Sequence, residues 1–376
     1  MQAEVAATTL PTTTTAPPTT IPPTTTTALP TTTTFPVAEA TIVDTGDLLP
    51  HLGVVGAATG PEGDIDFTRL LEELKPLVAG ADLAICHMEV PMAGDEEGFS
   101  GFPVFNAPEA LAAGVAEVGF DVCTTASNHS WDQGHDGLVH TLDVLDAAGL
   151  GHAGTYRDGA ERAAPLLLDA NGIRVALLSY TYGLNGFTQD NPWDVNLIDR
   201  SAILTDAHRA RSAGADFVML NMHWGEEYQH DPTQFQRDLA ESLLPAVDLD
   251  LIVGEHAHVV QTIEKIGDEF VVYGEGNLMS NSLNGSSRTR DGIAVVITLR
   301  RDEAGVRATR VEYAPVHQER GGMRVLPAAG VLMSGEIGGE PAPEDLLAAV
   351  RDTYDHVVEL VGTTPEIAPL PASLPT

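Results

Sequence analysis

From about residue 39 onwards, short apolar runs alternate with segments whose apolar residues follow a helical period. The runs include ADLAICHME, FDVCTTASNH, DFVMLNMHW and LDLIVG, and segments of helical period lie between successive runs. A chain with this alternation folds into βαβ units around a largely parallel sheet, because each crossover helix returns the chain to the same end of the sheet. The sequence therefore predicts an α/β protein.

Two segments depart from the parallel pattern. Asn171-Gly172 lies between two apolar runs, and this dipeptide favours the left-handed conformations of a tight β-hairpin turn. Residues 259–315 read as mainly antiparallel strands. Helices are expected over residues 67–80, 107–119, 135–149, 200–213, 232–246 and 343–361, where apolar residues recur at helical spacing.

Composition divides the chain into three parts. Residues 8–34 contain 16 Thr and 6 Pro in 27 positions and no charged residue, a composition that buries no core and favours extended polyproline II. We expect residues 1–38 to form a disordered stalk or linker, 39–335 the main domain, and 336–376 a C-terminal helix with a Pro-rich, disordered tail. A Thr/Pro stalk is typical of cell-surface proteins. This favours an extracellular or cell-surface location, although no signal sequence is visible.

Charge and cysteine content narrow the function classes. The formal net charge is −35, from 19 basic and 54 acidic residues, and such a surface repels nucleic acid and anionic membranes. No apolar run approaches the roughly 20 residues that a transmembrane helix needs. Cys86 and Cys123 lie in apolar strand-like runs without zinc-site spacing. They are either two buried thiols or one inter-strand disulfide.

Residue types that commonly bind metals recur at or just after the carboxyl ends of five predicted strands. They are Asp47, His87, Glu89, Asn128, His129, His223, His256 and His258. Open α/β sheets bind their ligands at this edge. Carboxylates, imidazoles and an amide oxygen suit Mn, Fe or Zn, and the lack of a thiolate set argues against a structural zinc site. One or two divalent metal ions are therefore expected there.

The stretch IVGEHAHVVQ gives the densest cluster of these residues. If the strand continues through it, His256 and His258 point to one side, about 7 Å apart at their Cα atoms, and Glu255 turns away as a loop carboxylate. This span suits two metal ions that share a bridging carboxylate and polarise a phosphoryl or carbonyl oxygen. Trp224 and Tyr228, which lie close to His223 in the sequence, are expected to line the entrance.

The order of five motifs between about residues 41 and 280 resembles the CapA-type capsule (poly-γ-glutamate) biosynthesis family. That family is similar in fold to the calcineurin-like metallophosphoesterases. The motifs are GDLLPH, ADLAICHMEVP, the stretch from SNHSWDQGHDG to LGHAG, the stretch from LNMHWGEE to VVQTIE, and VVYGEGN. The resemblance implies a four-layer α/β/β/α sandwich with its ligand residues at the carboxyl ends of the strands.

The resemblance also implies a role for individual residues. Its metal ligands correspond to Asp47, Glu89, Asn128, His223, His256 and His258, with Glu89 as the bridging carboxylate. His129 would contact a substrate phosphate or protonate the leaving group. Asp132 and Glu227 would orient imidazoles.

Some positions depart from the family pattern, among them Ser127, where the family usually has asparagine. Metallophosphoesterases carry a histidine two residues after the first aspartate, whereas Leu49 occupies this position after Asp47. The first metal is then under-ligated unless His51 compensates. His87 stands where the family usually has asparagine, and it is either an extra ligand or a strand residue that faces the other sheet.

Three hypotheses for function follow. The leading one is an envelope-associated, metal-dependent hydrolase that acts in capsule, poly-γ-glutamate or other cell-surface polymer metabolism, on the polymer or on a phosphoester. The alternative is a non-catalytic module that binds or anchors such a polymer with the help of a metal. The third is a degenerate fold with a structural site.

Overall fold

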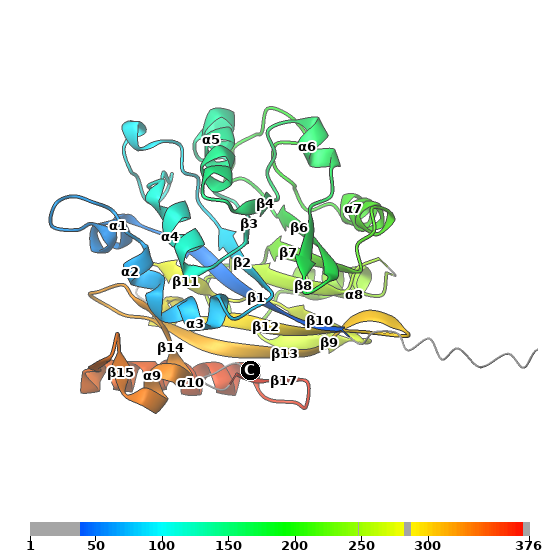
Figure 1. Cartoon of the computed structure of the whole chain (residues 1–376). Helices are drawn as coiled ribbons and strands as arrows, with labels where there is room; N and C mark the ends of the chain where they lie inside the picture. Colours follow the sequence, from blue (N-terminus) through cyan, green and yellow to red (C-terminus); the bar gives the residue numbers. More distant parts are fainter. Residues whose placement is uncertain (1–37, 247, 282–286, 371–376) are drawn as a thin grey trace, which may run out of the picture. The chain divides into compact units, whose positions relative to one another are not determined.

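Two β-sheets face each other across a shared apolar core (Figure 1). The first has the order β14 (Val325–Pro327), β13 (Gly305–Gln318), β12 (Asp291–Asp302), β1 (Ala38–Leu49), β2 (Leu83–Met88), β3 (Val122–Thr124) and β4 (Gly151–Ala153). Beside β1 lies β11 (Asn277–Ser280), and beside β13 lies β17 (Ile367–Pro369). The second sheet has the order β5 (Leu167–Ala170), β6 (Ile173–Thr181), β7 (Phe217–His223), β8 (Leu251–Glu255), β10 (Glu269–Val272) and β9 (Ile263–Ile266).

Helices cover the outer face of each sheet. On the first sheet these are α1 (Leu52–Ala58), α2 (Thr68–Leu71), α3 (Lys75–Val78), α4 (Ala110–Val118) and α5 (Gly134–Ala147). On the second sheet they are α7 (Arg200–Ser212) and α8 (Gln234–Leu243). The predicted four-layer α/β/β/α sandwich is therefore confirmed.

The long helix α10 and several short elements complete the fold. They are α6 (Gly159–Ala163), α9 (Ala328–Ser334), α10 (Glu344–Val361), the small hairpin of β15 (Glu336–Ile337) and β16 (Glu340–Pro341), and the 3₁₀ turns η1 (Glu72–Leu74), η2 (Asp95–Glu97) and η3 (Ser287–Arg290). α10 packs against β13 (Figure 1). No helix in the described part of the chain has the length and apolar character needed to cross a membrane.

This computed structural model describes residues 38–246, 248–281 and 287–370. The predicted Thr/Pro stalk, residues 1–38, lies outside the described residues except for its last position.

Strand β2 shows why the chain forms two layers of core. Leu83 and Ile85 face the core between the sheets, while Ala84, Cys86 and Met88 face the helices. Because both faces of such a strand are buried, its sequence is apolar from Leu83 to Cys86 and does not alternate with polar residues before His87 near its carboxyl end.

The predicted hairpin and most of the predicted antiparallel strands are confirmed. Asn171 and Gly172 have φ angles of 49° and 80°, and Ala170 pairs with Ile173 across them. Strands β9 and β10 pair antiparallel, as do β12 and β13. Two strands of this region also pair parallel with earlier ones, β10 with β8 and β11 with β1.

Two segments differ from their predictions. The helix expected over residues 67–80 is broken into α2, η1 and α3, and Pro76, which has no backbone N–H to donate, lies in the first turn of α3. The chain after Thr363 is not wholly a disordered tail, because Ile367–Pro369 pairs with β13 and Leu370 is buried. Apolar burial at these positions outweighs the Pro-rich composition that suggested disorder.

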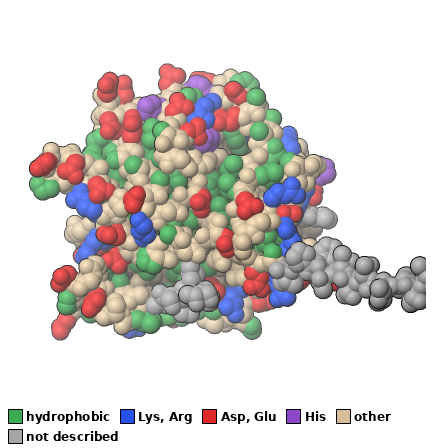
Figure 2. Space-filling model, in the orientation of Figure 1, with side chains coloured by type: hydrophobic (Ala, Val, Ile, Leu, Met, Phe, Trp, Pro, Cys, Tyr) green, Lys and Arg blue, Asp and Glu red, His purple; other side chains and the backbone are tan. Residues whose placement is uncertain are grey.

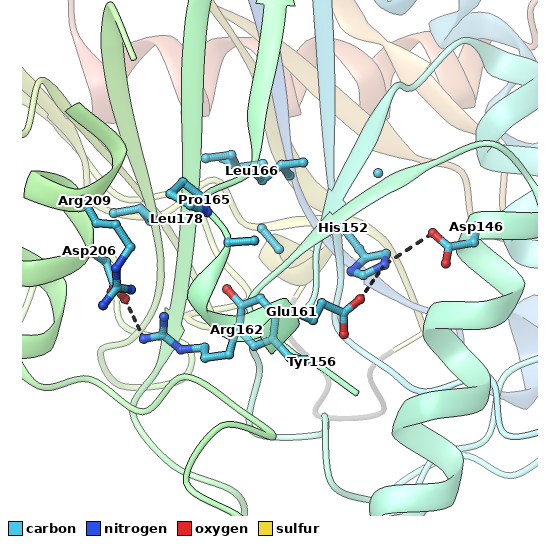
Figure 3. A pocket seen from close by; sticks show the side chains of 14 residues that line it. Asp146, His152, Tyr156, Glu161, Arg162, Pro165, Leu166, Leu178, Asp206 and Arg209 are labelled. Carbon is cyan, nitrogen blue, oxygen red and sulfur yellow. Dashed lines mark hydrogen bonds and ion pairs between the residues drawn. The ribbon is translucent and has the colours of Figure 1, made fainter. Parts of the chain in front are cut away.

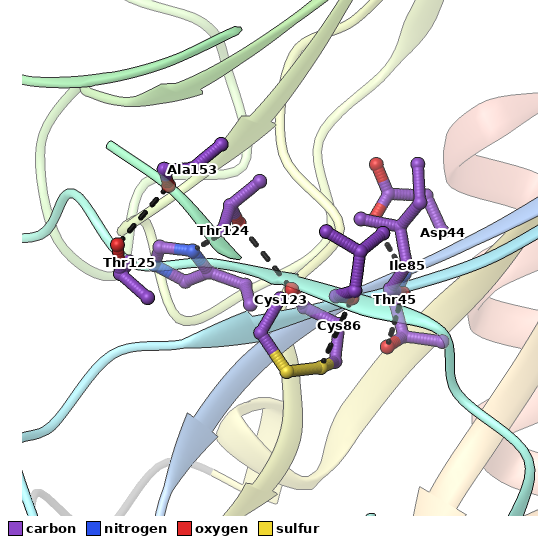
Figure 4. The surroundings of a disulfide bond; sticks show 10 residues. Asp44, Thr45, Ile85, Cys86, Cys123, Thr124, Thr125 and Ala153 are labelled. Atoms are coloured by element: carbon purple, nitrogen blue, oxygen red, sulfur yellow. Dashed lines mark hydrogen bonds between the residues drawn. A yellow bond between two sulfur atoms is a disulfide. The ribbon is translucent and has the colours of Figure 1, made fainter. Parts of the chain in front are cut away.

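The two cysteines form a disulfide between neighbouring strands (Figure 4). Cys86 on β2 and Cys123 on β3 are direct partners in the parallel ladder, with their Cα atoms 4.5 Å apart. The structure thus decides between the two alternatives that the sequence leaves open. The bond joins two strands whose following loops carry Glu89 and Asn128.

Candidate metal centre

The inner faces of both sheets end in polar side chains at the carboxyl ends of the parallel strands. On β7, Phe217 and Met219 face the core between the sheets, and His223 follows them on the same side. The six predicted ligands are all buried, with exposed fractions of 4% or less: Asp47, Glu89, Asn128, His223, His256 and His258. The structure therefore brings together residues that are more than 200 positions apart in the chain.

Asp47 contacts candidate ligands from both sheets. Its Oδ2 lies 3.0 Å from Nδ1 of His258, and its Oδ1 accepts a long hydrogen bond of 3.3 Å from the backbone N–H of His256. Oδ1 also lies 3.8 Å from Nε2 of His87. Burial alone would raise the pKa of Asp47, but the hydrogen bond and positive charge of His258 outweigh it and lower the pKa.

A chain of hydrogen bonds crosses from the first sheet to the second. Nδ1 of His87 lies 2.8 Å from the hydroxyl of Thr124, and its Nε2 lies 3.0 Å from Nδ1 of His223. Nε2 of His223 lies 2.9 Å from Oδ1 of Asn128. His87 therefore faces the other sheet, and it also forms a potential ligand group with Asp47 and His223. The two readings of His87 are compatible.

Glu89 has no hydrogen-bond partner for either carboxylate oxygen, although it is fully buried. The nearest imidazole nitrogens are Nε2 of His223 at 3.8 Å and Nε2 of His258 at 3.9 Å from Oε1. Burial, followed by the negative charge of Asp47, raises the pKa of Glu89 well above its usual value. A buried carboxylate without donors is unfavourable. A cation held by these oxygens and imidazoles would satisfy it, so the residues present fit a divalent metal ion.

The loop after β8 differs from its prediction. The strand ends at Glu255, and the backbone turns at His256 and His258, whose φ angles are 86° and 57°. Such left-handed conformations are uncommon for residues other than glycine and cluster at functional sites. The assumed strand alternation at His256 and His258 is therefore wrong. Glu255 shares no ligand group with them among the described residues, but it is the buried last residue of β8 and not a loop carboxylate.

Potential ligand atoms form three groups among the described residues, each with its atoms within 4.8 Å of one another. The groups are Asp47, His87 and His223; Asp47, Glu89 and His258; and Glu227, His256 and His258. Because Asp47 and His258 are each shared by two groups, the cluster is continuous. It offers more oxygen and nitrogen donors than one ion needs.

The two histidines of the β8 loop differ in protonation. Burial and then the positive charge of His258 lower the pKa of His256 to about 3, so its imidazole is neutral, the form that binds metals. Burial also acts to lower the pKa of His258, but the carboxylates of Glu89 and Asp47 together outweigh it and raise the pKa to about 9. Metal binding would therefore displace a proton from His258.

His129 and Asp132 form a pair beside the cluster. Nδ1 of His129 lies 2.7 Å from Oδ2 of Asp132, which also accepts a hydrogen bond from the backbone N–H of Phe105. The Phe105 ring packs edge-on to the imidazole at 4.7 Å. Asn185 connects this pair to the cluster, since it lies 3.4 Å from His129 Nδ1 and accepts a hydrogen bond of 3.2 Å from Asn128.

Several neighbours differ from their predictions or were missed. Trp224 is fully buried and its indole N–H donates to the backbone carbonyl of Tyr273, so it does not line the entrance. The Tyr228 ring, in contrast, lies 5.9 Å from the imidazole of His258. Tyr182, which the sequence analysis missed, packs 4.5 Å from His256. It follows the carboxyl end of β6, so the rule of polar residues at strand ends would have found it. His51 packs against Phe105 and belongs to none of the ligand groups found among the described residues.

A second set of buried carboxylates lies between the sheets, which we call the acid group: Asp44, Glu255 and Glu275. The side-chain amide of Asn221 donates to Asp44 at 2.7 Å and to Glu255 at 2.8 Å. Both oxygens of Glu275 are buried without partners. Burial raises the pKa of Asp44 to about 7 and those of Glu255 and Glu275 well above their usual value. None of the three belongs to a ligand group found among the described residues.

The four-layer α/β/β/α sandwich thus gathers carboxylates, imidazoles and an amide at the carboxyl ends of strands from both sheets, as a metal-binding protein would. More specifically, the chain belongs to the family of bacterial capsule synthesis proteins PGA_cap, whose family model matches residues 41–282.

Two curated relatives agree with this family. The chain is 28% identical over 230 residues to the capsule biosynthesis protein CapA of Bacillus anthracis, covering 60% of this chain and 54% of the relative. It is 30% identical over 209 residues to the PGA biosynthesis protein CapA of Bacillus subtilis (strain 168), covering 54% of this chain and 52% of the relative. The chain thus spans about half the length of these relatives.

The chain also has partial similarity to solved structures, two of which follow. The calcineurin-like phosphoesterase YfkN from Bacillus subtilis is 13% identical with a TM-score of 0.47, covering 86% of this chain and 99% of that one. The Haemophilus influenzae NAD nucleotidase NadN is 12% identical with a TM-score of 0.47, covering 89% and 64%.

Proposed function

We propose that the protein is a metal-dependent hydrolase that acts at the cell surface in the metabolism of capsule, poly-γ-glutamate or another envelope polymer. The observation that carries the proposal is Glu89, a fully buried carboxylate whose oxygens have no partner and lie within 4 Å of two imidazole nitrogens. A structural carboxylate would be expected to have donors. A carboxylate that bridges metal ions would need no such donors, because the ions satisfy its oxygens.

The residues that would hold one or two divalent ions are those of the cluster. They are Asp47, Glu89, Asn128, His223, His256 and His258, with His87 as an additional candidate. Their oxygen and nitrogen donors suit Mn, Fe or Zn. An ion bound there would supply a polarised phosphoryl or carbonyl oxygen and an acidified water.

The protein's own residues would handle the proton. Asp132 accepts from Nδ1 of His129 and so fixes the imidazole with Nε2 as the atom that exchanges protons. Phe105 restrains the ring from its edge. In this proposal Nε2 of His129 gives its proton to the leaving oxygen or nitrogen. Asn185 accepts a hydrogen bond from Asn128, one of the proposed ligands, and lies beside the His129 imidazole.

The disulfide supports the proposed location. Bonds such as Cys86–Cys123 persist in oxidising compartments and are rare in the cytosol. A capsule synthesis family also works on polymers of the envelope. The Thr/Pro composition of residues 8–34 would suit a spacer between the folded part and the cell surface.

The test is metal content and turnover of the purified full chain. Loaded with Mn²⁺, Fe²⁺ or Zn²⁺, it should retain one or two ions after desalting and hydrolyse bis(p-nitrophenyl) phosphate or a γ-linked glutamate oligomer. His256→Ala should lose turnover by at least about 100-fold, because it removes a ligand. His140→Ala is the control, since His140 pairs with Glu109 outside the ligand groups. A protein that retains no ion contradicts the proposal, as does His256→Ala with full activity.

One observation favours the alternative, a non-catalytic module that binds a polymer through its metal. Leu49, where metallophosphoesterases carry a ligand histidine, is buried in the core against the helices. The first ion would then have fewer ligands from the protein. Retention of metal and chelator-sensitive binding of γ-linked glutamate oligomers, without turnover of either substrate, would support this alternative.

A further inference from the structure

A cavity of about 430 Å³ lies between the ends of β12 and β13 and the first half of α10. Its lining includes Arg290, His317, Arg320, Asp345 and Asp352. None of the proposed metal ligands lines it. Its volume is in the range of small-molecule sites, so it can take a ligand larger than a free ion.

Most carboxylates of this cavity are already paired with cations that do not line it. Arg288 lies 2.9 Å from Asp291 and 3.0 Å from Asp352. Glu319 is held by Arg324 through both oxygens, at 2.7 and 3.2 Å. These acids are therefore neutralised without help from the cavity's own arginines.

Arg290 and Arg320 lack such partners. Among the described residues neither forms an ion pair, and Nη1 of Arg290 is buried without a hydrogen-bond acceptor. Burial and then the positive charge of Arg320 lower the pKa of Arg290 below its usual value. Two neighbouring guanidinium groups without counter-ions are unfavourable, and a buried donor without an acceptor costs further free energy.

A second cavity provides the comparison. It has a volume of about 290 Å³ and lies around α6 (Figure 3). There Arg162 and Arg209 both pair with Asp206, at 2.5 and 2.7 Å, and His152 lies 3.4 Å from Asp146. Figure 2 shows acidic and basic side chains interspersed over one face of the sandwich. In a chain with 54 acidic and 19 basic residues, unpaired arginines are therefore the exception.

We propose that the cavity beside α10 binds an oxyanion, the carboxylate or phosphate group of a small molecule or polymer end, through the guanidinium groups of Arg290 and Arg320. Guanidinium groups recognise such anions through paired, charge-assisted hydrogen bonds. Pro343, which precedes α10, and Leu346 in its first turn line the same cavity, and the positive end of this 18-residue helix favours an anion. This site does not depend on the metal centre.

The experiment is isothermal titration calorimetry of the full chain at low ionic strength, with inorganic phosphate in one arm and a γ-linked glutamate oligomer in the other. Saturable binding in either arm is expected. Arg290→Gln should weaken it about 10- to 100-fold, because a charged hydrogen bond is lost. Arg320→Gln should weaken binding similarly. Because Arg320 is exposed, this variant should fold like the parent and so separates loss of binding from loss of folding. Arg162→Gln, in the comparison cavity, should leave binding unchanged.

The outcomes are distinct. Binding of phosphate alone assigns the site to phosphoryl groups, and binding of the oligomer alone assigns it to carboxylates. Asp345→Asn should strengthen binding, because Asp345 is the lining carboxylate for which the described residues show no ion pair. No saturable binding in either arm overturns the proposal. So does binding that Arg290→Gln and Arg320→Gln both leave intact.

Discussion

Two sets of buried ionisable residues meet between the sheets, and they differ in the partners that each provides. The ligand cluster around Glu89 combines the buried carboxylates of Asp47 and Glu89 with four imidazoles and the amide of Asn128. The acid group of Asp44, Glu255 and Glu275 has only one side-chain donor shown among them, the amide of Asn221. Both sets are almost completely buried. Burial alone therefore does not define an ion site.

The difference lies in what can neutralise each carboxylate. In the acid group a proton can do so, and burial raises the pKa values of all three acids. In the ligand cluster imidazole nitrogens of His223 and His258 lie within 4 Å of the Glu89 carboxylate, and a cation would neutralise Glu89 while displacing the proton of His258. We expect the first set to hold protons and the second to hold metal ions.

Loss of the disulfide should give the largest effect on stability, and it should affect the ligand cluster more than the acid group. Cys86→Ala with Cys123→Ala releases a loop of 37 residues, which lowers the free energy of unfolding by about 4 kcal/mol. The bond joins the strands that precede Glu89 and Asn128, so metal affinity should fall as well. Urea denaturation checks the first effect, and reductant added to the parent protein should reproduce it. An unchanged urea midpoint would contradict this assignment.

Glu89→Gln should separate the two sets most clearly. It removes the charge that a metal would neutralise, so metal affinity should fall by at least about 100-fold. Without metal, the same change should raise the melting temperature, because an unpaired buried carboxyl is removed. Metal titration and thermal unfolding of the same samples measure both. Equal metal affinity in parent and variant would show that Glu89 is not a ligand.

The acid group should make stability depend on pH. Asp44 has its pKa raised from 3.8 to about 7 in the folded protein, so the folded state keeps a proton that the unfolded state loses. Stability then falls as pH rises between these values. Between pH 5 and 7 the metal-free protein should lose about 2 kcal/mol from this residue, and Asp44→Asn should remove most of that slope. A variant with the parent's slope would exclude Asp44 as the source.

The sequence predicted most of the candidate ligands because the residues on the inner faces of the strands change from apolar to polar at the carboxyl ends. On β7, apolar Phe217 and Met219 precede Asn221 and His223 on one face, and this change from apolar to polar marks the edge where ligands meet. Helical periods and the Asn171-Gly172 turn likewise depend only on local residues.

The remaining features depend on the register between strands or on backbone torsions. The disulfide requires that Cys86 and Cys123 be exact neighbours in the ladder, and short sequence patterns do not determine register. The left-handed turns at His256 and His258 replace a strand that local propensity favours. The acid group was missed because Glu275 and Asp44 lie far apart in the chain and only the packing of two sheets buries them together.

The matched change Glu275→Gln should have the smallest effect and completes the comparison. It is the same substitution as Glu89→Gln, at a residue equally buried and equally without partners. Because Glu275 belongs to the acid group, metal affinity should stay within about twofold of the parent value. The free energy of unfolding of the metal-free protein at pH 8 should rise by about 1 kcal/mol, since a neutral amide no longer needs a proton. If Glu275→Gln lost metal as Glu89→Gln does, the two sets would form one electrostatic unit, and the division between protons and metal ions would be wrong.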